Sequence, residues 1–158
     1  MNAQELFFRT IQSGQIENVA LQLQNNPHVV NSEDARGFTP LIFATYFDME
    51  DIAKLLLEHK AHVNGKDGSG NTALIGVSFK GNINLVNLLI DHGADINAQN
   101  NNGTTALSFA TQYNQMEVVK LLLAHKADAS LVDANGKTAL DHANEKSFEA
   151  IASLLKSS

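Results

Sequence analysis

The chain has 158 residues, 44% of them hydrophobic and 18% charged, and its 11 Lys and Arg against 17 Asp and Glu give a formal net charge of −6. This is the composition of a globular protein. The acidic balance argues against nucleic acid and anionic membranes as partners, because binding to phosphate backbones needs clustered basic side chains. The lack of cysteine excludes disulfides and thiolate chemistry. With no signal peptide and no apolar run of about 20 residues, we expect a cytoplasmic protein.

The N-terminal part holds two amphipathic pieces between Glu5 and Asn31, joined around Gly14. From Gly37 onward the motif Gly-x-Thr-x-Leu occurs four times, and its threonines at 39, 72, 105 and 138 are 33 residues apart. A fixed period of this length is typical of repeat proteins that stack one small unit on the next. The N-terminal pieces then form a degenerate first unit.

Each unit predicts two short helices. Thr39 is suited to cap a first helix that begins at Pro40. The second helix, over 51–58, places Ile52, Leu55 and Leu56 on one face at helical spacing. A Gly- and Asp-rich run over 65–70 follows and predicts a turn with short extended arms. Helices of this length are unstable alone in water, so the units must stack.

The period, the segment 34–44 and the segment 88–97 resemble the ankyrin repeat. The resemblance implies an all-α solenoid of stacked helix-turn-helix units joined by β-turn, hairpin-like loops. We expect a single domain over 1–158 with five repeats, at 4–33 (N-terminal cap), 34–66, 67–99, 100–132 and 133–158 (C-terminal cap). The histidine that the family carries after the motif leucine is replaced here by Ile42, Ile75, Ser108 and Asp141. Asp141 and Lys156 are polar where earlier repeats are mostly apolar, as expected where an array ends.

No sequence motif for catalysis or metal binding is present, so we expect no enzyme activity, no catalytic residue, no metal and no cofactor. His59, His92 and His125 are 33 residues apart. Packed helices lie about 8–10 Å apart, so neighbouring members of this ladder cannot share one ion. We expect them instead to complement the C-terminal ends of the second helices. His142 is the one histidine that we place on the first-helix surface.

The resemblance also implies that turn tips and first helices form a concave surface that binds a partner protein. Five of the ten aromatic residues fall on it, and aromatic side chains are favoured interface anchors. Tyr46, Phe47 and Phe79 have an alternative place in the core between first helices, and Phe43 and Phe109 are expected to be core residues. The predicted partner-binding residues are Arg36, Phe38, Tyr46, Phe47, Asn71, Phe79, Lys80, Thr104, Gln112, Tyr113 and Lys137.

Two functions of different kinds follow from this surface. The first is a non-enzymatic protein–protein interaction module, acting as adaptor, inhibitor or regulatory partner and monomeric on its own. The alternative is a haem-handling or chaperone-like companion of a bacterial enzyme such as catalase, with Tyr46, Tyr113 or His142 as an axial ligand. One local prediction is independent of function: Lys60 and Lys126 stand where Gly93 stands in the repeat between them, so we expect left-handed backbone there.

Overall fold

A computed structural model describes the whole chain, residues 1–158. It contains ten α-helices, one short 3₁₀ helix and no β-strand, which confirms the predicted all-α fold. The helices are α1 (Ala3–Gln12), α2 (Ile16–Asn25), α3 (Pro40–Tyr46), α4 (Glu50–Glu58), α5 (Ala73–Lys80), α6 (Ile83–Asp91), α7 (Ala106–Gln112), α8 (Met116–Ala124), α9 (Ala139–Glu145) and α10 (Glu149–Lys156), and the 3₁₀ helix η1 covers Pro27–Asn31.

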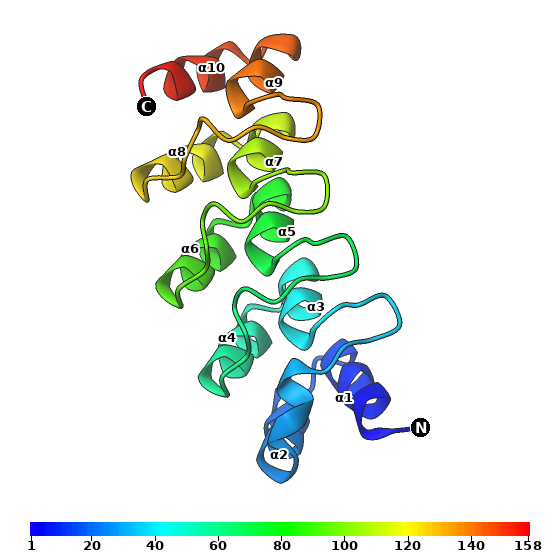
Figure 1. The fold of residues 1–158 in the computed structure, drawn as a ribbon. Coiled ribbons are helices and arrows are strands. Elements are labelled where there is room, and N and C mark those ends of the chain that lie inside the picture. Colours follow the sequence, from blue (N-terminus) through cyan, green and yellow to red (C-terminus); the bar gives the residue numbers. More distant parts are fainter.

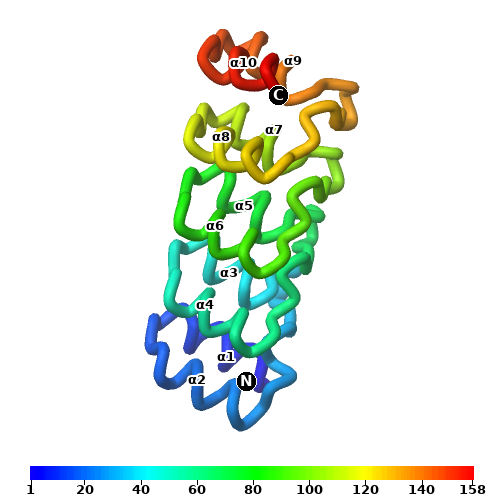
Figure 2. Tube along the Cα trace, turned by 90° about the vertical axis from the view of Figure 1, so that its left-hand side faces the viewer, coloured from blue at the N-terminus to red at the C-terminus, as the bar shows by residue number.

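The helices form two rows that rise side by side from the N-terminal to the C-terminal end of the stack (Figure 1). One row contains the first helix of each unit, and α3 packs on α5, α5 on α7, and α7 on α9. The second row contains α4, α6, α8 and α10, which also pack in order. The view from the side shows the same regular rise, with the termini at opposite ends (Figure 2). Long loops project from the side of the first-helix row (Figure 1).

Threonine caps set where the first helices begin. In each of the four units the side-chain oxygen of the motif threonine accepts a hydrogen bond from the backbone N–H three residues later, at 3.1–3.2 Å. Such a cap stabilises a helix by about 1 kcal/mol. Pro40 follows Thr39 at the first helical position, as predicted. The second helix expected over 51–58 begins one residue earlier, at Glu50.

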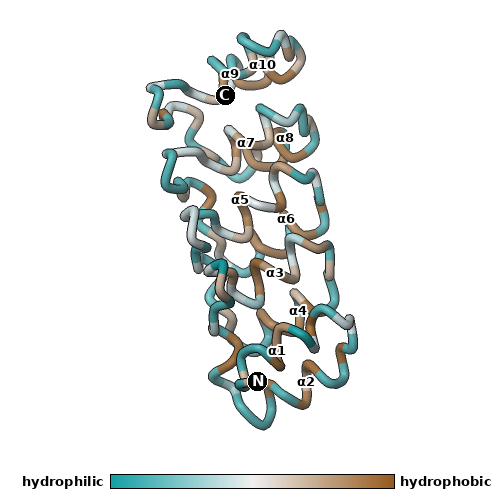
Figure 3. Tube along the Cα trace, turned by 90° about the vertical axis from the view of Figure 1, so that its right-hand side faces the viewer, coloured by the Kyte–Doolittle hydropathy of each residue, from teal (hydrophilic) through white to brown (hydrophobic).

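The core lies between the two rows and between successive units. It is one cluster of 33 buried apolar side chains that runs the length of the stack. Apolar residues concentrate on the helices and polar residues on the projecting loops (Figure 3). Ile42 and Ile75 are buried where the family has histidine, so apolar contact replaces a hydrogen bond there. Asp141 in the same column is exposed, and it completes a capping box with Thr138.

Left-handed residues end several second helices, as the sequence predicts. Lys60 and Lys126 have φ of 66° and 65°, and Gly93 between them has 87°. A side chain with a Cβ is strained in this region by about 1–2 kcal/mol. The chain therefore keeps two strained lysines where glycine fits without cost.

The projecting loops are closed by one short side chain each. The Oδ1 atom of the first loop residue accepts hydrogen bonds from the backbone N–H groups two and four residues later, at 2.8–3.1 Å. The N–H of the same residue donates to the carbonyl four residues later, at 3.0 Å. These bonds give the hairpin-like turn that was expected, although its arms form no strand. The four loop-closing residues are Asp34, Asp67, Asn100 and Asp133.

Asparagine side chains link successive units at the other end of the helices. The Oδ1 atoms of Asn31, Asn64 and Asn97 accept the backbone N–H groups 31 residues later, at 2.7–2.8 Å. We call these three contacts the asparagine brackets. On the loop side, Asn101 N–H donates to the Ser69 carbonyl at 3.0 Å and so ties two loops together. Both edges of the stack are thus bonded from one unit to the next.

Candidate protein-binding groove

Aromatic rings from four helices and one loop form a connected network on the first-helix side. Phe43 contacts Phe8 of α1 and Phe47 at ring-centroid distances of 6.0 and 4.7 Å. Tyr46 and Phe79 lie 6.3 Å apart and connect α3 to α5. Eight of the ten aromatic residues of the chain belong to this network, namely Phe8, Phe38, Phe43, Tyr46, Phe47, Phe79, Phe109 and Tyr113.

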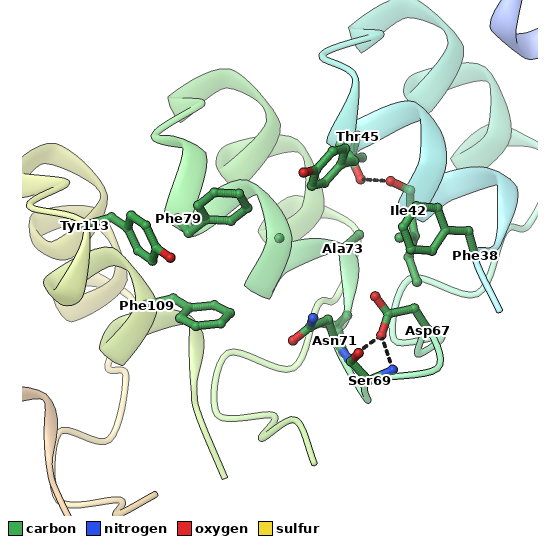
Figure 4. Close-up of a pocket in the computed structure, with 13 residues that line it drawn as sticks. Phe38, Ile42, Thr45, Asp67, Ser69, Asn71, Ala73, Phe79, Phe109 and Tyr113 are labelled. Carbon is green, nitrogen blue, oxygen red and sulfur yellow. Dashed lines mark hydrogen bonds between the residues drawn. The ribbon is translucent and has the colours of Figure 1, made fainter. Parts of the chain in front are cut away.

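A groove of about 330 Å³ opens beside this network, in the middle of the stack. It is bounded by the first helices α3, α5 and α7 and by the loops that precede α3 and α5, and Figure 4 shows the rings of Tyr113, Phe79 and Phe38 along it. Pockets that take ligands begin near this size and combine apolar walls with a few polar groups. The groove is lined by Phe38, Ile42, Thr45, Tyr46, Asp67, Ser69, Asn71, Thr72, Ala73, Gly76, Phe79, Phe109 and Tyr113.

The aromatic rings are more exposed than core residues are. Tyr113 is 56% exposed, Phe47 is 48% and Tyr46 is 38%. Phe38 and Phe79 are half-buried. The alternative that Tyr46, Phe47 and Phe79 are core residues is therefore wrong for the first two and only partly right for Phe79. Packing within the chain leaves much of this apolar surface in contact with solvent.

Five of the predicted partner-binding residues line the groove: Phe38, Tyr46, Asn71, Phe79 and Tyr113. The others lie outside it. Thr104 is only 7% exposed, so it offers almost no surface to a partner. The remaining side chains are engaged locally: Arg36 with Asp34, Phe47 with Phe43, Lys80 with Asp48, Gln112 with Ser108, and Lys137 with Glu145.

Three groove residues were missed in the sequence. Phe109 was assigned to the core, yet it is half-buried and contacts the Phe79 ring at 6.2 Å. Asp67 was taken as a turn residue only, and Gly76 was given no role. Their signal lies in the comparison of columns, because Gly76 stands where other repeats carry Phe43, Phe109 and His142.

Ion pairs at the edge of the groove hold two carboxylates ionised. Burial alone would raise the pKa of Asp34, but the Arg36 guanidinium at 2.6 Å and two backbone N–H donors outweigh it and lower the pKa. The pKa of Asp48 is also lowered, first by the hydrogen bond from the Asn82 amide and then by the Lys80 ammonium. Lys80 further lies over the Tyr46 ring, 4.9 Å from its centroid.

His142 has a partner of its own away from the groove. It was predicted on the first-helix surface, but its side chain is only 13% exposed and its Nε2 lies 2.8 Å from Asp133 Oδ2. Burial alone would raise the pKa of Asp133, yet hydrogen bonds from His142 and from two backbone N–H groups hold it below its usual value. Because His142 belongs to this pair, only Tyr46 and Tyr113 of the three suggested haem ligands line the groove.

The histidine ladder lies at the ends of the second helices. His59 and His92 each place Nδ1 at 3.0 and 2.8 Å from the carbonyl four residues earlier, which is the helix-end role predicted for them. No group of three His, Cys, Asp or Glu side chains in the structure could hold a metal ion. No helix combines the length and the apolar character that crossing a membrane requires.

The fold and the groove define a helical-repeat solenoid with an exposed aromatic surface. A family model of ankyrin repeats in three copies matches residues 7–100 and 74–158, so the chain belongs to the ankyrin-repeat family. No curated protein matches the sequence. Ankyrin repeats are in general protein–protein interaction modules and are typically not enzymes.

Proposed function

We propose that this protein binds a partner protein through the aromatic groove and acts as an adaptor, inhibitor or regulatory partner without chemistry of its own. The observation that carries the proposal is the exposed part of the ring network around Tyr46 and Tyr113. Large rings bury much area on binding at little cost in rotamer freedom, so they are frequent hot spots. We further propose that the free chain is monomeric and acts in the cytoplasm.

The test is affinity capture from a lysate of the native cell, with quantitative mass spectrometry. Wild type is compared with Tyr46→Ala/Tyr113→Ala, and denaturation curves of both proteins are recorded in parallel. Each hot-spot truncation costs about 2 kcal/mol of binding. We therefore expect the partner to be lost from the groove variant while the variant stays folded.

The matched control is His59→Ala/His92→Ala/His125→Ala, which changes exposed residues at the far ends of the second helices. This control should retain the partner. Retention by the groove variant and loss from the histidine variant would assign binding to the wrong face. A Soret band that appears with hemin and disappears in the tyrosine variant would favour the haem-handling alternative instead.

A further inference from the structure

The four loop-closing residues differ in what their second side-chain atom binds. Asp34 Oδ2 accepts from the Arg36 guanidinium at 2.6 and 3.0 Å. Asp133 Oδ2 pairs with His142 at 2.8 Å. Asn100 has an amide there, which donates to Asn71 at 2.9 Å. Asp67 Oδ2 has no hydrogen bond or ion pair within the chain, although Asp67 Oδ1 closes its loop like the others.

The sequence explains why Asp67 is left open. The residue that matches Arg36 in this repeat is Ser69, which is too short to fold back on the carboxylate. The residue that matches His142 is Gly76, which has no side chain. A Cβ built on Gly76 would meet nothing within 4 Å, so the place of the missing ring is empty space.

This empty space is part of the aromatic groove. Asp67, Ser69 and Gly76 all line it, together with the rings of Phe38, Tyr46, Phe79, Phe109 and Tyr113. Figure 4 shows one Asp67 oxygen bonded to its own loop, whereas the other carries no such bond. An ionised carboxylate among aromatic rings favours a cation, because the ring faces and the carboxylate both attract positive charge.

The chain itself shows which cation fits such a carboxylate. Arg36 binds Asp34 through two nitrogens while its guanidinium carbon lies 4.4 Å from the Phe38 ring centroid and 5.7 Å from that of Phe43. Arginine is suited to this double contact because its planar group pairs with a carboxylate and stacks on rings at once. The net charge of −6 also favours a basic partner segment.

We propose that the groove holds an arginine side chain of the partner protein, with its guanidinium on Asp67 Oδ2 and against the groove rings. The inference rests on the proposed function, since it names the chemistry of the partner at the same groove. It predicts that the partner presents an exposed arginine in a segment narrow enough to enter between the loops and the first helices.

The test uses N-acetyl-arginine-methylamide as probe, titrated into the ¹⁵N-labelled full chain and followed by NMR. We expect a dissociation constant of about 1 mM and shifts that concentrate on residues 67–79. The citrulline analogue has the same shape without the charge, so it should bind at least about tenfold more weakly. The lysine analogue should rank between them because it keeps the charge but not the planar group.

Two variants test the site in the protein. Asp67→Asn keeps the loop-closing oxygen, as Asn100 does in the next loop. It should weaken the arginine probe at least about tenfold, while Asp95→Asn, which removes one charge elsewhere in the same repeat, should not. Gly76→His should fill the site as His142 does at Asp133 and so block the probe, whereas Gly76→Ala should leave binding intact.

Equal binding of the citrulline probe, equal binding by Asp67→Asn, or no groove shifts up to about ten times the expected constant would overturn the inference. Failure of the two proposals can be told apart by partner capture. If the tyrosine variant loses the partner and Asp67→Asn keeps it, the groove binds protein but not through this arginine. If both keep it, the proposed function fails as well.

Discussion

Gly76 and Gly93 offer the same substitution with opposite expected signs. Both glycines have open space where a Cβ would stand. Gly76 lies inside α5 with ordinary helical backbone, whereas Gly93 has φ of 87°. Alanine at Gly76 should stabilise the fold by about 1 kcal/mol, the difference in helix propensity between the two residues.

Alanine at Gly93 should have the reverse effect. Left-handed backbone costs a Cβ-bearing residue about 1–2 kcal/mol, and the stiffer unfolded chain returns about 0.5 kcal/mol, so the net loss is about 1 kcal/mol. Because neither methyl group meets a neighbour, packing does not contribute to the difference. The two variants should therefore differ by about 2 kcal/mol in the free energy of unfolding, or about 4–8 °C in Tm.

The assay is urea and thermal unfolding of Gly76→Ala, Gly93→Ala and wild type, followed by far-UV circular dichroism. Both changes fall in one predicted repeat, 67–99, so partial unfolding of the stack affects them alike. A lower midpoint for Gly76→Ala, or no loss for Gly93→Ala, would show that backbone conformation does not decide stability at these positions.

Three further outcomes are expected. Lys60→Gly and Lys126→Gly should each raise the unfolding free energy by about 0.5–1 kcal/mol, because the left-handed strain is relieved and only part of the gain is lost to the freer unfolded chain; a fall for both variants in denaturant titrations would refute this. Asp133 has a lowered pKa, so the folded state binds fewer protons than the unfolded state, and its contribution is complete above about pH 4 and lost as the pH falls through the folded pKa. The stability difference between wild type and Asp133→Asn should therefore shrink in acid, and a difference that is constant with pH would contradict it. Asn97→Ala removes the side-chain oxygen of one asparagine bracket and should cost about 1 kcal/mol in urea unfolding, while an unchanged midpoint would show that the bracket adds nothing.

The helices were predictable because their signals are local and repeated. A capping threonine before Leu41 and an apolar face from Ile52 to Leu56 fix each pair of helices, and the fixed period repeats the result. Positive φ at Lys60 and Lys126 was also predictable, since Gly93 in the same column shows what the backbone requires.

The groove was predictable only in part. Aromatic residues such as Tyr46 and Tyr113 could be placed on the right surface by their columns. The role of Asp67 could not be read from its own column, because Asp34, Asp67 and Asp133 look alike in sequence and differ in the partner that each side chain reaches. That difference depends on rotamers and on the space left by an absent side chain, and a pattern of residue types does not record either.

The asparagine brackets have a consequence for how this protein can change in length. Asn31, Asn64 and Asn97 bind backbone N–H groups, which any residue other than proline provides, so each joint accepts whatever unit comes next. Units of 33 residues can therefore be gained or lost whole, whereas a single inserted residue shifts one joint out of reach. A tandem copy of 67–99 would set two open carboxylates side by side, and a partner with two basic side chains would then be held by avidity without any newly evolved surface.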